Sequence, residues 1–123
     1  MSNRFVILHH RLADGEHWDL MLQRGDVLLT WQLLREPIDR SSLPILARRI
    51  GDHRKAYLQY EGPISDNRGS VRRVDGGTVD FEETTPNRYI FALNGRRLSG
   101  RFLLAREGGE WVLSEFGIAA DGT

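Results

Sequence analysis

The chain has 123 residues, no cysteine and a formal net charge of zero. This length predicts one domain, and the lack of cysteine excludes a disulfide framework, a thiolate-ligated metal and a cysteine nucleophile. The charge balance excludes a strongly basic nucleic-acid-binding protein but is compatible with a local basic patch. No apolar run approaches the roughly 20 residues that span a bilayer, and the N-terminus does not resemble a signal peptide. We therefore expect a cytoplasmic protein without membrane contact.

The basic residues are unevenly divided, with sixteen arginines and a single lysine, Lys55. Arginine presents a planar fork of donors that suits phosphate and carboxylate groups. A genomic base composition that enriches arginine explains the same count, so the arginines alone do not decide between the two interpretations.

In chain order, the pattern predicts short strands separated by turn residues. We expect strands at residues 5–10, 17–23, 27–34, 43–50, 56–60, 71–74, 78–82, 89–93, 96–98, 101–105 and 110–115. Turns are predicted at Arg24-Gly25-Asp26, Asp75-Gly76-Gly77, Asn94-Gly95 and Glu107-Gly108-Gly109, of which Asn-Gly is the preferred two-residue hairpin turn.

Two segments are expected to interrupt this series. Residues 38–44 have room for one helical turn, and Pro44 predicts an edge or late-starting strand over 43–50. Many short strands at regular spacing close into a barrel or pack as a sandwich. We predict an all-β, mainly antiparallel fold: a small closed or partly open barrel of about eight strands with at most one short helix. Residues 1–123 are expected to form this single domain.

The first candidate site is the stretch that begins His17-Trp18-Asp19. On a strand, His17 and Asp19 share one face, roughly 6–7 Å apart along the backbone, while Trp18 turns to the core face. If the preceding strand pairs antiparallel, His9 or His10 returns beside His17. Two imidazoles and one carboxylate suit a mid-row transition metal with positions open for water and substrate. The alternative is a polar surface pair without a metal.

A second candidate group combines Asp52-His53 with Tyr57, near Arg48 and other arginines. Such a histidine could contact an anion or transfer a proton, and a solvated, charged turn is the alternative. Arg68 and Arg72 are further candidates for phosphate contacts, and they too have solvation as the alternative.

The order of these residues resembles the 3′-phosphoesterase domain of bacterial ATP-dependent DNA ligase D, the module that heals DNA ends in non-homologous end joining. The resemblance runs from about Arg4 to Leu113. It rests on Phe5-Val6-Ile7, His10, His17-Trp18-Asp19, Trp31, Arg35, Asp52-His53, Tyr57, Glu61-Gly62, Leu93-Asn94-Gly95, Leu98-Ser99-Gly100 and Trp111-Val112-Leu113. That family has a small β-barrel fold with its active site on a concave face.

The resemblance implies a manganese-dependent enzyme that removes a 3′-phosphate or a 3′-terminal ribonucleotide and leaves a 3′-hydroxyl. Other divalent transition metals are alternatives to Mn²⁺. The implied metal ligands are His10, His17 and Asp19, and the implied catalytic residues are His53 and Tyr57. Arg35, in place of a family lysine, is the implied phosphate contact, with Arg48, Arg68 and Arg72 as further nucleic-acid contacts. Nucleic-acid 3′ ends are the implied partner, together with a ligase, polymerase or Ku-type repair protein, and we expect a monomer.

The sequence departs from the family pattern at several positions. Met21 stands where the family has an arginine and Leu8 where it has a glutamine, and neither side chain can hold a phosphate. Gly51 replaces a glutamate, Ile45 replaces an arginine, and Asn67-Arg68-Gly69 replaces a Tyr-Gly loop. Two other functions therefore stay open: a non-catalytic module that binds DNA ends or a repair partner, and a phosphoesterase with a changed substrate.

Overall fold

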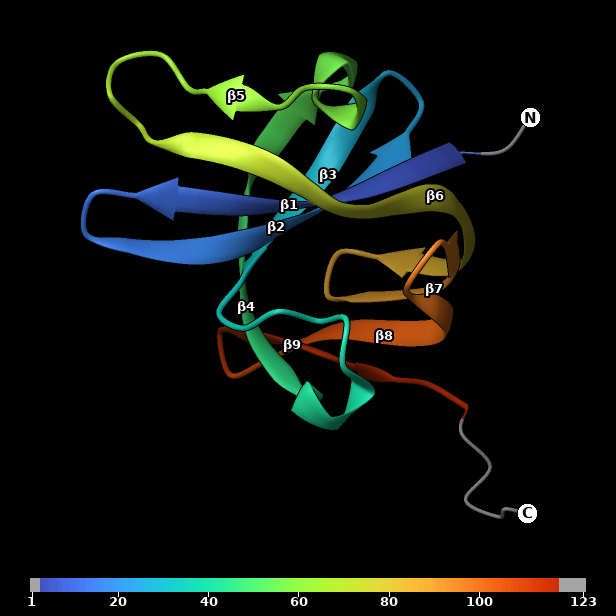
Figure 1. The fold of residues 1–123 in the computed structure, drawn as a ribbon. Coiled ribbons are helices and arrows are strands. Elements are labelled where there is room, and N and C mark those ends of the chain that lie inside the picture. Colours follow the sequence, from blue (N-terminus) through green and yellow to red (C-terminus); the bar gives the residue numbers. More distant parts are fainter. Residues whose placement is uncertain (1–2, 118–123) are drawn as a thin grey trace.

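The computed structural model describes residues 3–117, which fold into nine strands and two 3₁₀ helices (Figure 1). The strands are β1 (Asn3–Leu12), β2 (Gly15–Arg24), β3 (Val27–Leu33), β4 (Ile45–Arg54), β5 (Gly62–Pro63), β6 (Ser70–Thr85), β7 (Arg88–Gly95), β8 (Ser99–Glu107) and β9 (Glu110–Glu115). The 3₁₀ helices are η1 (Arg40–Ser42) and η2 (Lys55–Leu58).

The sheet closes on itself. Its strand order is β1-β2-β3-β4-β9-β8-β7-β6-β5, and β1 also pairs with β6, so that eight strands form a ring and β5 lies outside it. All of these pairings are antiparallel. The predicted all-β antiparallel barrel is therefore confirmed. It contains two short 3₁₀ helices, where at most one short helix was predicted. Within residues 3–117, no helix has the length and apolar character to cross a membrane.

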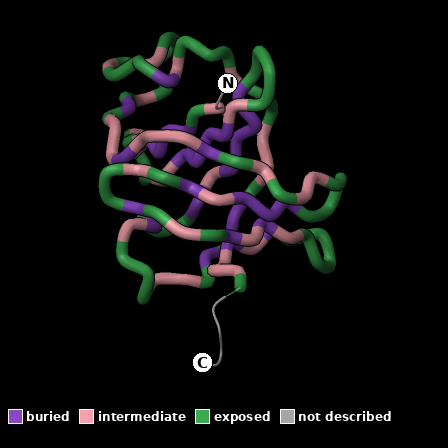
Figure 2. Tube along the Cα trace, turned by 90° about the vertical axis from the view of Figure 1, so that its right-hand side faces the viewer, coloured by how far each residue is buried: buried purple, intermediate pink, exposed green. Residues whose placement is uncertain are grey.

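Buried positions are purple along the chain trace in Figure 2. Their hydrophobic side chains form two cores on opposite faces of the first strands, and successive residues of β1 belong alternately to one core and to the other. Phe5 and Ile7 point into the barrel, where they join buried residues from all the other strands of the ring. Val6 and Leu8 point outward into a smaller core. Leu58 of η2 belongs to this second core. Met21 and Val71 of the same core lie beside the candidate site residues His10 and Asp19.

The predicted turn at Asp75-Gly76-Gly77 is wrong. Residues 70–85 instead form one long strand, β6, which pairs with β1 along its first part and with β7 along its second. The reason lies in a close backbone approach, since a Cβ on Gly77 would lie 2.0 Å from the carbonyl oxygen of Asn94. The glycines thus allow the strand to pass from one neighbour to the next rather than to reverse.

Three other expectations need correction. Residues 55–58 form η2 where a strand was predicted, because residues 55–61 leave the sheet to cover the outer core. β4 starts late, after Pro44, as expected, but it is not an edge strand because it pairs with β3 and β9. The β7–β8 hairpin turns at residues 96–98 rather than at Asn94-Gly95, because the buried carboxylate of Asp75 accepts hydrogen bonds from the backbone N–H groups of that turn.

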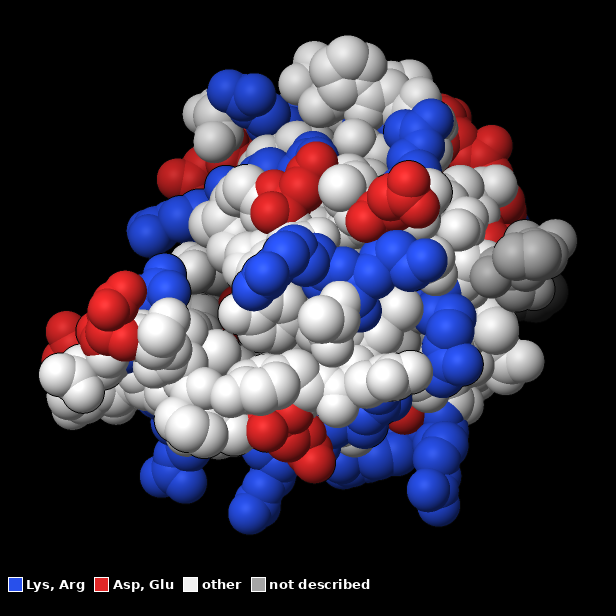
Figure 3. Space-filling model, turned by 90° about the horizontal axis from the view of Figure 1, so that it is seen from above, with Lys and Arg blue, Asp and Glu red and all other residues white. Residues whose placement is uncertain are grey.

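Basic and acidic side chains share the surface, in keeping with the zero net charge. In Figure 3, several basic side chains project along one edge of the molecule, while acidic side chains interrupt the basic ones elsewhere on that face. Arg101 pairs with Glu82 at 2.6 Å and Arg88 with Glu83 at 3.0 Å. Local pairing therefore neutralises part of the arginine excess.

Candidate metal centre

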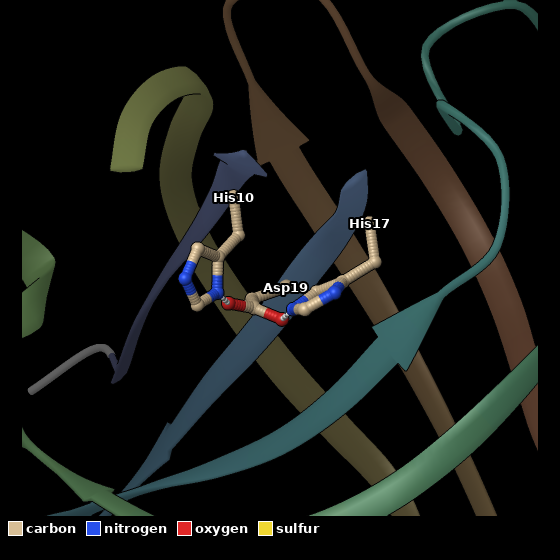
Figure 4. A group of neighbouring side chains, drawn as sticks. All are labelled: His10, His17 and Asp19. Atoms are coloured by element: carbon tan, nitrogen blue, oxygen red, sulfur yellow. Dashed lines mark ion pairs between the residues drawn. The ribbon is translucent and has the colours of Figure 1, made fainter. Parts of the chain in front are cut away.

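The histidines and aspartate of the first hairpin come together on its outer face. His10 of β1 lies directly opposite His17 of β2 in the antiparallel register, and Asp19 follows two residues later on the same face of β2. In Figure 4, the three side chains point toward one another, with the carboxylate of Asp19 between the two imidazoles. One ligand atom from each residue lies within 4.8 Å of the others.

The carboxylate at the centre of this group is nearly inaccessible to solvent, with 4% of Asp19 exposed. Its oxygens lie 3.4 Å from Nδ1 of His10 and 3.1 Å from Nε2 of His17. Although Oδ1 of Asp19 and Nε2 of His17 are this close, they form no hydrogen bond with each other, and neither of these buried atoms has another hydrogen-bond partner. Buried polar atoms are rarely left unpaired, and a cation between them would satisfy both. Two imidazole nitrogens and a carboxylate oxygen also match mid-row transition metals, so the residues fit a metal ion.

A backbone carbonyl fixes the protonation of His10. Its Nε2 lies 2.7 Å from the carbonyl oxygen of Arg68, and a carbonyl can only accept, so Nε2 carries the proton. Nδ1, which faces Asp19, is then left with its lone pair free, as a metal ligand requires. His9 lies on the other face of β1, where its ring stacks on Trp18 at 4.7 Å. The cluster therefore uses His10 rather than His9.

Next to the cluster is a small pocket of about 120 Å³. It is lined by His10, Asp19, Met21, Gln32, Ile50, His53, Tyr57, Ile64 and Val71. The rings of His53 and Tyr57 meet edge to face at 5.4 Å. Nδ1 of His53 donates to the carbonyl oxygen of Gly51 at 2.9 Å, which leaves Nε2 to exchange a proton. Residues from both sequence-predicted groups thus border one pocket.

The four arginines predicted to contact phosphate do not line this pocket. Arg35 donates to the carbonyl oxygens of Ser42 and Pro44 and so braces the loop before β4. The guanidinium of Arg68 donates to Ser65 within its own loop. Arg72 pairs with His9 in the register of β1 and β6, on the face away from the pocket.

Arg48 is better placed than the other three. It is paired with Gln32 across β3 and β4, and Gln32 is paired with Asp19 across β2 and β3. Directly paired residues project from the same face, and adjacent strands lie about 4.8 Å apart. Arg48 is therefore on the face of the metal cluster, two strands away from Asp19.

Two polar groups of the site, the Gln32 side chain and the backbone carbonyl of Arg68, are absent from the residues predicted from the sequence. Gln32 is the polar residue between two buried neighbours on β3, and the alternation of that strand would have placed it on the face of Asp19. The carbonyl oxygen of Arg68 gives no sequence signal, because any residue in that loop could supply it.

Comparison with protein-family models gives a match over most of the chain. The model of the DNA ligase D 3′-phosphoesterase domain matches residues 8–106. The multifunctional non-homologous end joining protein LigD of Mycobacterium bovis is 34% identical over 119 residues, an alignment that covers 90% of this chain and 16% of that relative. The relative from Pseudomonas aeruginosa is 27% identical over 114 residues, covering 84% of this chain and 13% of that relative. This chain thus spans about one sixth or less of the length of these relatives.

Proposed function

The chain belongs to the family of the DNA ligase D 3′-phosphoesterase domain, and from this membership we propose that it is a metal-dependent phosphoesterase that heals nucleic-acid 3′ ends. It would remove a 3′-phosphate or a 3′-terminal ribonucleotide in DNA repair, in the pathway of non-homologous end joining named for its relatives. The observation that supports this most directly is the meeting of His10, Asp19, His53 and Tyr57 around one pocket.

The first hairpin would hold the metal, for which we propose Mn²⁺ with other divalent transition metals as alternatives. His10 would bind through Nδ1, His17 through Nε2 and Asp19 through its carboxylate. When bound, such an ion supplies Lewis-acid polarisation of a phosphoryl oxygen and offsets its negative charge. The carbonyl oxygen of Arg68 keeps the proton of His10 on Nε2, which leaves the ligating nitrogen free without a rearrangement.

His53 and Tyr57 would act on the other side of the phosphate. Because Nδ1 of His53 donates to the carbonyl oxygen of Gly51, Nε2 is the nitrogen that would act on the phosphate. It would donate a proton to the leaving oxygen from the imidazolium form of the ring, which carries a proton on both nitrogens. The Tyr57 hydroxyl would position a phosphate oxygen by a hydrogen bond. Arg48, on the same face as Asp19, would reach the nucleic-acid backbone and make binding dependent on salt.

A second candidate function is a non-catalytic module that binds nucleic-acid ends. It is favoured by the pocket itself, which has Met21 in its wall and no arginine or lysine among the described residues that line it. A phosphoesterase with a changed substrate accommodates the same observation. In the binding module we would expect the metal to hold the phosphate without turnover.

The deciding experiment is a 3′-end assay with Mn²⁺ on two primer–templates, one ending in a 3′-phosphate and one in a single ribonucleotide. We expect conversion to a 3′-hydroxyl by the natural chain and loss of conversion in Asp19→Ala. Equal conversion by Asp19→Ala would exclude the proposed metal centre. Binding of Mn²⁺ and of the primer without conversion would favour the second function, and Met21→Arg would then test whether a guanidinium in the pocket restores activity.

A further inference from the structure

The pocket beside the metal cluster is too small for a nucleoside. Its volume of about 120 Å³ falls below the roughly 300–1,000 Å³ that is usual for organic ligands. It has room for a phosphate-sized group but not for the sugar and base to which that phosphate is attached. The rest of a 3′-terminal nucleotide must therefore lie beside the pocket.

A larger groove adjoins the pocket at two shared residues, Tyr57 and Ile64. Its volume is about 390 Å³, and its remaining wall is formed by Arg54, Ala56, Gln59, Tyr60, Pro63 and Ser65. The groove lies between η2 and β5, the two elements at the top of Figure 1. Its size is that of a site for an organic ligand, and it opens directly beside the candidate catalytic tyrosine.

Two tyrosines give this groove an aromatic wall. The rings of Tyr57 and Tyr60 meet edge to face at 5.8 Å, and 37% of Tyr60 is exposed. The Tyr60 hydroxyl donates to the carbonyl oxygen of Pro63, which fixes the ring against the loop. An exposed aromatic ring held in place beside an apolar wall is the kind of surface on which unpaired bases stack.

Polar and charged groups surround this apolar wall. Gln59 and Ser65 provide hydrogen-bonding groups, and Arg54 provides a positive charge that suits a backbone phosphate. Such a groove accepts any base, because every base has a flat apolar face.

We propose that this groove is a nucleobase subsite, in which the terminal base of an unpaired 3′ end stacks on Tyr60 while its phosphate enters the pocket of the metal cluster. This rests on the proposed function for the identity of the phosphate. The inference adds that the end is bound unpaired and that Tyr60 is a binding residue. A base in this groove cannot at the same time pair with a template strand.

The test uses binding without turnover. The probe is a single-stranded DNA with 2-aminopurine as its last base and a 3′-phosphate, titrated with the full chain in EDTA. Stacking of the base on the Tyr60 ring should quench the fluorescence of the probe. We expect Tyr60→Leu to abolish the quench and weaken binding about tenfold, within the range known for base–aromatic stacking. Tyr60→Phe keeps the aromatic ring but loses the hydrogen bond to Pro63, so it should retain the quench with at most a small loss of affinity, and thermal melting shows whether both variants fold.

The matched control is the same oligonucleotide with an abasic terminal residue. The natural chain should bind it about tenfold more weakly than the intact probe, and Tyr60→Leu should not weaken that binding further. The inference is overturned if Tyr60→Leu leaves the quench intact, or if it weakens the abasic and intact probes equally.

The two proposals fail in different ways. If Tyr60 governs the quench but no 3′ end is converted with Mn²⁺, the subsite stands and the phosphoesterase function falls. If 3′ ends are converted but neither the quench nor the KM depends on Tyr60, the phosphoesterase function stands and the subsite falls.

Discussion

Asp19 is a buried carboxyl group between two histidines, and its Oδ1 atom has no hydrogen-bond partner. A metal ion should therefore change the stability of the fold mainly through this residue. A ligand that binds only the folded chain stabilises it by about 2.7 kcal/mol at one hundred times its Kd. We therefore predict that Mn²⁺ raises the Tm of the natural chain by several degrees and leaves the Tm of Asp19→Asn unchanged. Differential scanning calorimetry with and without EDTA measures both.

The exposed Asp26, in the turn between β2 and β3, offers the control for this prediction. Asp26→Asn should keep the full response to Mn²⁺. In EDTA, Asp19→Asn should be no less stable than the natural chain, because an amide of the same shape replaces a buried carboxyl group whose Oδ1 atom has no hydrogen-bond partner. A Tm gain of the same size in Asp19→Asn would place the metal elsewhere.

Asp75 is a second buried carboxylate, 3% exposed, and its role is structural. It accepts hydrogen bonds from the backbone N–H groups of Arg96, Arg97 and Leu98. Asp75→Ala leaves these donors without their acceptor, which we expect to lower the free energy of unfolding by about 3 kcal/mol. Urea unfolding measures the loss, and the exposed Asp80 supplies a comparison. An equal loss in Asp80→Ala would refute the structural role.

At the level of elements, the glycines of β6 decide how the barrel closes. An alanine at position 77 would bring its Cβ to 2.0 Å from the carbonyl oxygen of Asn94, so β6 and β7 would have to separate. We predict that Gly77→Ala lowers the free energy of unfolding by about 2–3 kcal/mol. Gly15→Ala is the matched control, since a Cβ there has no neighbour within 4 Å, and it should unfold at the same urea concentration as the natural chain.

An ion pair crosses β7 and ties β6 to β8. Glu82 accepts two hydrogen bonds from Arg101, and this guanidinium lowers the pKa of Glu82 below its usual value. A carboxyl group whose pKa is lower in the folded chain than in the unfolded chain stabilises the fold at pH values above its unfolded pKa. That stabilisation is lost as the pH falls through the pKa of the folded chain. Glu82→Gln should therefore be slightly less stable than the natural chain at pH 7 and equally stable at strongly acidic pH. A difference that persists in acid would assign the effect to packing.

Local patterns and distant contacts account for what the sequence could and could not predict. The turns at Gly25 and Gly108 were predicted correctly because two neighbouring strands and their turn lie together in the chain. The bend at Gly77 was misread because a glycine pair looks alike in a turn and in a strand that changes partners. Only the pairing with β1, which is far away in the sequence, distinguishes the two cases.

The same distinction holds for the site. His17 and Asp19 were found together because both belong to one alternating strand. The carbonyl oxygen of Arg68 was not found, because it reaches His10 from a loop 58 residues later. Arg35 shows the same limit from the other side, since its guanidinium donates to the carbonyl oxygens of Ser42 and Pro44, contacts that its position in the family pattern does not reveal.

For the molecule as a whole, zero net charge implies a modest electrostatic contribution to nucleic-acid binding. Two arginines flank the proposed site: Arg54 in the groove and Arg48 on the face of Asp19. Each phosphate contact with single-stranded nucleic acid contributes about −0.7 to the slope of log K against log salt. We predict a slope of log K against log salt between about −1 and −2 for a single-stranded 3′-phosphorylated oligonucleotide. Fluorescence anisotropy over a range of KCl concentrations measures it. A slope steeper than about −4 would indicate a basic surface outside this site.

The order of the strands divides the chain into a part that lines the candidate site and a part that completes the barrel. Every side chain that lines the pocket or the groove comes from residue 10 to residue 71, whereas β7, β8 and β9 complete the ring and contribute only to the inner core. Substitutions after β6 should therefore affect activity through folding stability, whereas the substitutions that alter the site directly lie between residues 10 and 71. In evolution or in a directed library, a loss of activity caused by the later part should be recoverable by stabilising mutations anywhere in the barrel, because both parts share the inner core.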